Sequence, residues 1–325
     1  MAPQPGAADA LDRPAQIEPL AATSLLLDVA VLPGGRIVCV GERGHVLVST
    51  DGGKTFVQQH VPTRATLTRV YFTDDQHGWA VGHDEVILRT NDGGNSWTRV
   101  HWEPGHRQPL FDVWFGAKGT GFAVGAYSTV LRSGDFGATW QPIAFEPEPV
   151  ASVTRRAAGP ADDADVGVTQ PHLYALRSAG EGRLYLAAEA GHVYRSDDGG
   201  DHWRELASPY GGTFFGVLPL GTDTVLAYGL RGHLFRSDDA GTSWSAIDTG
   251  AADLLAAAGR LPGGGVVIAG LSGVLLVSDD ARHFHLHREA DRRGYSGVAA
   301  SGGSIVLVGD GGVRLVPTDS LRGTQ

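Results

Sequence analysis

Short apolar stretches broken by glycine, each followed by a polar box, recur along this chain. In the copy that starts at Trp79, WAVGHDEVILRTNDGGNSW, two apolar runs flank a turn and lead into Thr-x-Asp-x-Gly. Related copies start at Val38, Phe122, Tyr185 and Leu226, and two shorter ones start at Val267 and Val306. Runs of four to six residues with period-two alternation favour half-buried strands over helices. The chain therefore consists of seven repeats of one β unit.

Each repeat is predicted to contain four strands, A to D, counted from the centre outward. In the second copy they span Leu67–Phe72, Gly78–Val81, Val86–Thr90 and Ser96–Val100. The box aspartates follow one another at 41, 43, 63, 41 and 41 residues. A four-stranded unit of about 40 residues is the blade of a β-propeller. We predict an all-β fold, a seven-bladed β-propeller with Asp-box turns.

The box is expected to be structural. Its aspartate accepts backbone N–H groups in a tight turn, and its closing aromatic ring fills the space between neighbouring sheets. The six box aspartates are Asp51, Asp92, Asp135, Asp198, Asp239 and Asp280. The closing aromatic residues are Phe56, Trp97, Trp140, Trp203, Trp244 and Phe284.

The seventh copy ends after its third strand, near Ser320, which leaves an unpaired sheet edge. The N-terminal segment PAQIEPL resembles the fourth strands TRVHWEP and QPIAFEP. We therefore predict that Gln16–Pro19 pairs with the last blade and closes the ring. The expected domains are a flexible N-terminus at 1–13, one propeller at 14–320 and a tail at 321–325. An insertion at about 145–170 interrupts the propeller.

The two faces of such a propeller carry different loops. The A–B turns and the boxes lie on one face, named here the box face, while the B–C turns, the D-to-A connections and the 145–170 insertion lie on the other, the B–C face. The B–C face is where the copies stop repeating one another, and variable loops on a rigid scaffold are where binding usually resides. We expect the following residues on this face to bind a partner: Arg43, His83, Tyr127, Glu189, Arg231, Arg292 and Arg293.

Strand A places charged residues near the propeller axis in only three blades. These are Asp28, Arg69 and Asp112, where the other blades have alanine or glycine. They either line a polar channel, paired with one another, or contact a ligand there.

Composition narrows the functional classes. The net charge of -10 gives no basic field for phosphate backbones or acidic lipid, which argues against nucleic acid and membrane surfaces as partners. Cys39 is the single cysteine, so no internal disulfide or cysteine-based metal cage can form. His45, His192 and His233 share one repeat position, one in each blade, which is too far apart for a common metal. We expect no metal, no cofactor and a monomer.

The sequence around Met1 has neither a basic nor an apolar leader region, and no run of 18 apolar residues occurs in the chain. A mature exported protein whose signal had been removed would look the same. Periplasmic or otherwise exported localisation is the expectation, and a cytoplasmic location stays open.

The boxes, together with the lead-in VG-x-x-G-x-[VIL]-[LFY]-R-[ST], resemble the photosystem II stability and assembly factor family of Asp-box propellers and its non-photosynthetic bacterial relatives. The resemblance covers about residues 14 to 320. It implies a non-catalytic, exported seven-bladed propeller that assists membrane proteins through an arginine-rich patch. Arg43, Arg231, Arg292 and Arg293 match positions of that patch, whereas a further arginine cluster of the family has no counterpart here. Relatives in other bacteria resemble accessories of membrane exporters, so the implied partner is a membrane-protein client or a transporter component.

A sialidase-like glycoside hydrolase is the alternative, because Asp-boxes also occur in those propellers. Such an enzyme needs three inward arginines, a tyrosine nucleophile with a glutamate partner and an Arg-Ile-Pro start. Tyr127 and Glu189 could take the two catalytic roles, but Arg36 and Ile37 are followed by Val38, and only Arg69 is expected near the axis. We therefore expect a binding protein rather than an enzyme.

Overall fold

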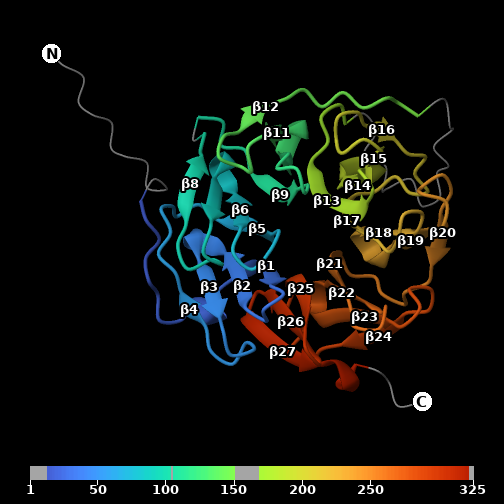
Figure 1. The fold of residues 1–325 in the computed structure, drawn as a ribbon. Coiled ribbons are helices and arrows are strands. Elements are labelled where there is room, and N and C mark those ends of the chain that lie inside the picture. Colours follow the sequence, from blue (N-terminus) through green and yellow to red (C-terminus); the bar gives the residue numbers. More distant parts are fainter. Residues whose placement is uncertain (1–12, 104, 151–167, 322–325) are drawn as a thin grey trace.

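The computed structural model describes residues 13–103, 105–150 and 168–321. It contains seven antiparallel sheets. Within each sheet, strands that are consecutive along the chain are neighbours. In Figure 1 the sheets surround a common centre, and the inner strands β1, β5, β9, β13, β17, β21 and β25 are nearest to it. The predicted all-β seven-bladed propeller is confirmed.

The first four blades contain four strands each. Blade one consists of β1 (Leu26–Val31), β2 (Ile37–Gly41), β3 (Val46–Ser49) and β4 (Val57–Gln58). Blade two consists of β5 (Leu67–Phe72), β6 (Gly78–Gly82), β7 (Ile87–Thr90) and β8 (Thr98–His101). Blade three consists of β9 (Leu110–Phe115), β10 (Gly121–Gly125), β11 (Val130–Ser133) and β12 (Gln141–Pro142). Blade four consists of β13 (Leu173–Gly180), β14 (Arg183–Ala188), β15 (Val193–Ser196) and β16 (Arg204–Glu205).

Blades five and six repeat this plan, and blade seven is shorter. Blade five consists of β17 (Phe214–Pro219), β18 (Val225–Gly229), β19 (Leu234–Ser237) and β20 (Ser245–Ile247). Blade six consists of β21 (Leu255–Arg260), β22 (Val266–Gly270), β23 (Val274–Ser278) and β24 (His285–Arg288). Blade seven consists of β25 (Tyr295–Ser301), β26 (Ser304–Gly309) and β27 (Gly312–Pro317), with the short turn η10 (Thr318–Ser320) after it.

The box turns form as predicted. In blade one, Asp51 Oδ1 accepts the backbone N–H groups of Lys54 and Thr55, each at 3.0 Å, and Oδ2 accepts the Thr55 hydroxyl at 2.6 Å. The Ser49 hydroxyl donates to the same carboxylate at 2.8 Å. The shortened sixth box still closes, because Asp280 accepts the N–H groups of Arg282 and His283 at 2.8 Å. A single carboxylate thus organises each turn.

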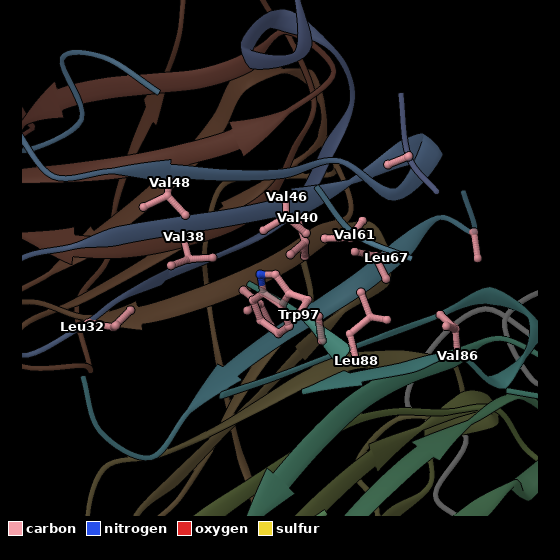
Figure 2. Packing of buried hydrophobic residues seen from close by; sticks show 14 residues of the cluster. Leu32, Val38, Val40, Val46, Val48, Val61, Leu67, Val86, Leu88 and Trp97 are labelled. Carbon is pink, nitrogen blue, oxygen red and sulfur yellow. The ribbon is translucent and has the colours of Figure 1, made fainter. Parts of the chain in front are cut away.

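The closing aromatic of each box packs against the preceding blade. Trp97 of blade two is 7% exposed and lies among Val38, Val40 and Val46 of blade one (Figure 2). The pattern repeats around the ring, and Phe56 of blade one packs with the side chains of blade seven. The aromatic of one repeat therefore fills the hydrophobic interface with its neighbour.

Closure of the ring differs from the prediction. The fourth strand expected from Gln16–Pro19 does not form, and the sheet of blade seven has three strands among the described residues. The N-terminal segment instead follows blade one, where the Gln58 amide donates to Gln16 O and accepts from Glu18 N, both at 2.8 Å. A motif of a few residues that resembles an outer strand does not determine which sheet edge it joins.

Blades seven and one meet through their own inner strands. The Ser296 hydroxyl on β25 donates to Leu26 O on β1 at 2.7 Å. Val306 and Val308 of β26 share a buried cluster with Ile37 and Cys39 of β2. The short turn η2 (Ala21–Thr23) contacts β27, and its Ala21 is buried in the same cluster. Side chains buried between blades seven and one thus close the ring, in place of the predicted pairing of an N-terminal strand with blade seven.

Residues 151–167 of the predicted insertion lie outside the described residues. The chain before them runs along the outer edge of blade four, where Glu148 N donates to Trp203 O and Glu205 N donates to Glu148 O, both at 2.8 Å. The chain returns at Pro171 and His172, beside the B–C turn of blade three, because Ser128 N donates to Pro171 O at 3.0 Å.

Candidate binding face

The B–C turns of blades one to six share one backbone conformation. Each is a single 3-10 turn whose middle residue has a φ between 52° and 57°. The turns are η3 (Glu42–Gly44), η4 (His83–Glu85), η5 (Ala126–Ser128), η7 (Glu189–Gly191), η8 (Leu230–Gly232) and η9 (Leu271–Gly273). The backbone is therefore constant around this face, and only the side chains vary.

A glycine precedes five of these six turns, η7 being the exception, and it allows the previous connection to pass close by. A Cβ atom on Gly82 would lie 2.1 Å from the carbonyl oxygen of Thr66. This oxygen accepts the backbone N–H of His83 at 2.9 Å. Gly125 and Gly229 meet the carbonyls of Pro109 and Thr213 in the same way. This close approach joins each B–C turn to the D-to-A connection beside it, so the two kinds of loop form one face.

All seven predicted partner-binding residues lie on the B–C face. Arg43, Tyr127 and Arg231 are the exposed middle residues of their turns. His83 and Glu189 begin their turns, the first exposed and the second half-buried. Arg292 and Arg293 are exposed in the connection between β24 and β25. They do not form one cluster, because they are distributed over the blades of the ring.

The arginines occupy one arc of the face, from blade five through blade seven to blade one. Arg293 lies between two turns: its carbonyl accepts the Gly273 N–H at 2.8 Å, and its Nη1 lies 3.4 Å from Gly311 O. Among the described residues, Arg43 and Arg292 make no ion pair within 4.0 Å, whereas Arg293 Nε lies 3.8 Å from Asp291 Oδ2. This basic arc can therefore offer guanidinium groups to an acidic or polar partner.

The opposite arc, over blades two to four, is aromatic and acidic. Tyr127 is 57% exposed, and its ring packs edge-on against His172 at 4.8 Å. The Nδ1 atom of this histidine accepts the backbone N–H of Tyr127 at 3.0 Å, and the backbone N–H of His172 donates to Glu189 Oε2 at 3.1 Å. His172, which the sequence interpretation did not single out, thus joins Tyr127 to Glu189.

Glu85 is a second residue of this arc that the sequence interpretation missed. Its carboxylate is buried, with Oε1 3.1 Å from His106 Nδ1 and Oε2 3.6 Å from His101 Nε2. Its φ is 52°, at a position that is glycine in four of the other turns. A glutamate in the left-handed region, where the repeat prefers glycine, is the signal that could have identified it.

The predicted channel residues are joined by ion pairs near the axis. Asp28 Oδ1 accepts from Arg69 Nη1 at 3.1 Å, and Arg69 Nε lies 3.1 Å from Asp112 Oδ1. Arg177, which was not predicted, pairs with the other oxygen of Asp112. The carboxylates also accept backbone N–H groups from the next blade, Val70 to Asp28 and Leu176 to Asp112, at 2.9 and 2.7 Å. This network connects blades one to four.

Burial and the neighbouring charges have opposite effects on the pKa values of Asp28 and Arg69. Burial raises the pKa of the Asp28 carboxyl above its usual value, although Arg69 and two backbone N–H groups counteract it. Burial disfavours the charged Arg69 guanidinium, but Asp28 and Asp112 outweigh that cost and raise its pKa. Arg69 is therefore held in its cationic form.

Neither a metal site nor a membrane span is evident in the described part of the chain. No group of three or more histidine, cysteine, aspartate or glutamate side chains there could hold a metal ion. No helix in the same ranges has the length and hydropathy that a bilayer crossing requires.

The fold and its turns define the class of protein: a seven-bladed β-propeller built from Asp-box, or BNR, repeats. Residues 56–214 match the family model described as photosynthesis system II assembly factor YCF48. A curated relative, the photosystem II assembly lipoprotein Ycf48 of Picosynechococcus sp., is 32% identical over 76 residues. That match spans 23% of this chain and 22% of the relative's own length.

Solved structures agree in fold. The structure titled "YCF48 bound to D1 peptide" has a TM-score of 0.67 at 18% identity and covers 93% of this chain and 95% of that chain. Together with the family model, it identifies the chain as a BNR propeller similar to the photosystem II assembly factors. A catalytically inactive virginiamycin B lyase from Staphylococcus aureus also matches, with a TM-score of 0.68 at 11% identity, over 92% of this chain and 96% of that one. Because one propeller hosts both binding proteins and enzymes, the fold alone does not determine activity.

Proposed function

We propose that this chain is a non-catalytic binding propeller that docks a membrane-protein partner, as an assembly factor or a transporter accessory, through its B–C face. One observation carries the proposal. The backbone of the B–C turns is the same in six blades, while the side chains placed on it differ from blade to blade. A constant scaffold with variable side chains is the arrangement expected of a recognition surface.

Two further facts support this choice. A solved propeller of similar fold is bound to a D1 peptide, and a curated relative is named an assembly lipoprotein. The basic arc of the B–C face provides exposed guanidinium groups, and arginine is enriched at the energetically important positions of interfaces. An exported location accords with the relative's name and forms part of the proposal.

Charge reversal on the two faces tests the proposal. Arg231, Arg292 and Arg293 are changed together to glutamate, and the tagged protein is used to recover partners from the native membrane fraction. We expect recovery of the membrane partner to fall at least about tenfold, because each reversal replaces attraction by repulsion at the interface. A matched triple variant on the box face, Lys54→Glu, Lys118→Glu and Arg282→Glu, should recover the partner normally.

Thermal unfolding of both triple variants shows whether the propeller remains intact. Equal recovery by the two variants would contradict docking through the B–C face. The glycosidase alternative has its own measurement, because hydrolysis of a fluorogenic sialoside by the pure protein, abolished in Tyr127→Phe, would show that the protein is an enzyme.

A further inference from the structure

A cavity of about 260 Å³ lies on the propeller axis. Its outer ring is formed by the second residues of the inner strands, among them Phe111, Tyr174 and Phe215. The inner strands begin at the B–C end of the blades, since Leu26 pairs with Gly41, directly before turn η3. The cavity therefore lies at the B–C end of the axis, and its volume suits a group smaller than the drug-sized ligands of about 300–1,000 Å³ sites.

The walls of the cavity are unequal. Blades two to five contribute Arg69, Arg177 and four aromatic rings, the fourth being that of Tyr228, whereas blades six and seven contribute small side chains such as Ala257 and Ser296. The small residues leave the space open, and the arginines and aromatic rings determine which ligands the cavity suits. This difference between the two sides of the cavity is not needed to hold the ring together, because buried side-chain clusters between neighbouring blades already do that.

The arginines are the more exposed members of the charged network beside the cavity. The side chains of Arg69 and Arg177 are 27% and 23% exposed, whereas those of Asp28 and Asp112 are 5% and 1% exposed. Each carboxylate is covered by the arginine that it binds and by a backbone N–H group from the next blade. A ligand that enters therefore reaches the arginine side chains before the carboxylates, and a guanidinium group is suited to bind an anion.

Aromatic rings in contact with one another form a track from the surface to the cavity that Arg69 and Arg177 line. Tyr127 contacts His172, which lies 6.0 Å from Phe111, and Phe111 stacks on Tyr174 at 5.2 Å. Tyr174 then contacts Phe215 at 4.8 Å. Flat apolar surfaces beside a cationic group suit a ligand with an apolar or aromatic body and an acidic end.

We propose that the axial cavity is a binding site for a carboxylate attached to an apolar or aromatic group, with Arg69 and Arg177 facing the carboxylate and Phe111, Tyr174 and Phe215 facing the body. The ligand is either a free small acid or the end of a peptide chain that carries the same chemistry. A small acid or a short peptide can occupy the cavity in the absence of a docked membrane protein, so binding there is measured separately from docking on the B–C face.

Titration calorimetry of the purified chain tests this site. Phenylacetate should bind at one saturable site, and the uncharged isostere phenylacetamide should bind at least about tenfold more weakly, because it lacks the charge-assisted hydrogen bonds. The peptide Gly-Gly-Phe with a free carboxylate, compared with its amide, reveals the source of the ligand. Tighter binding of the free peptide than of phenylacetate supports a chain end, and binding of phenylacetate alone supports a free acid.

Substitutions in the lining of the cavity test whether phenylacetate binds there. Arg177→Gln should weaken phenylacetate binding about tenfold, while Arg132→Gln, an arginine on the box face that pairs with Asp201, should leave it unchanged. Phe215→Leu leaves the ion pairs intact and should weaken binding about threefold, so the test survives if Arg177→Gln folds poorly. Absence of saturable binding by any carboxylate, equal binding of the amide, tighter binding of benzylamine, or no effect of Arg177→Gln and Phe215→Leu would each overturn the proposal.

Discussion

At the scale of the residue, the box aspartates show how one side chain fixes a turn. The Asp135 carboxylate accepts the Thr139 hydroxyl at 2.7 Å, the Thr139 N–H at 2.9 Å and the Ser133 hydroxyl at 2.8 Å. These hydrogen bonds, led by that from the Thr139 side chain, lower the pKa of Asp135 to about 2. The charged form is thus the one that the folded turn stabilises.

The first prediction follows from that pKa. In the unfolded chain an aspartate titrates near about 3.9, so the contribution of Asp135 is present above about pH 4 and is lost as the pH falls toward about 2. Asp135→Asn should lower the melting temperature by a few degrees at pH 7, and the difference should shrink at pH 3 and below. Asp201→Asn, which removes only an exposed ion pair, is the control and should have little effect. A difference that is constant with pH would contradict this account.

Glu85 supports a second prediction about backbone strain. Two variants remove the same carboxylate, Glu85→Gly and Glu85→Ala, but only glycine adopts a φ of 52° without a Cβ penalty. The glycine variant should be more stable than the alanine variant by about 1 kcal/mol in chemical denaturation. Equal stability of the two would show that the turn relaxes and that Glu85 is not strained.

At the scale of the element, the blade interface depends on the aromatic residue that closes each box. Trp97 is buried against blade one, and its Nε1 donates to Gly94 O at 3.0 Å (Figure 2). Trp97→Ala should lower the free energy of unfolding by about 3–5 kcal/mol, the usual cost of removing a large buried ring. Trp97→Phe keeps most of the packing and should cost clearly less. Equal losses in both variants would attribute the effect to the hydrogen bond rather than to packing.

The sequence predicted most elements of the propeller and failed at its junction. The strands of the second copy were placed within two residues of β5, β6, β7 and β8, because the repeat supplies several aligned examples. Residues 14 to 20 have no such support, because their similarity to the outer strands rests on a single short segment. The hydrogen bonds of Gln58 retain the segment beside blade one.

The axial site was predicted in part. Asp28, Arg69 and Asp112 stand out because they occupy one repeat position and differ from the other blades. Arg177 lies two residues beyond that position in blade four, so a comparison restricted to one position misses it. The aromatic track combines residues of inner strands, a turn and a connection, and only the closed ring brings them together.

At the scale of the whole molecule, the two faces have different roles. The box face repeats the same carboxylate turn, whereas the B–C face has a constant backbone with an arginine arc and an aromatic, acidic arc. Docking through the B–C face is the central claim. The charge-reversal variants test it through the loss of partner binding, and covalent crosslinking tests it by showing which face contacts the partner.

The most direct measurement is site-specific photo-crosslinking in the native membrane fraction. A photoreactive residue is placed at position 231, on the B–C face, or at position 282, on the box face, where the arginine is similarly exposed. The account predicts a covalent adduct with a membrane protein from position 231 and none from position 282. An adduct from position 282 without one from position 231 would contradict it.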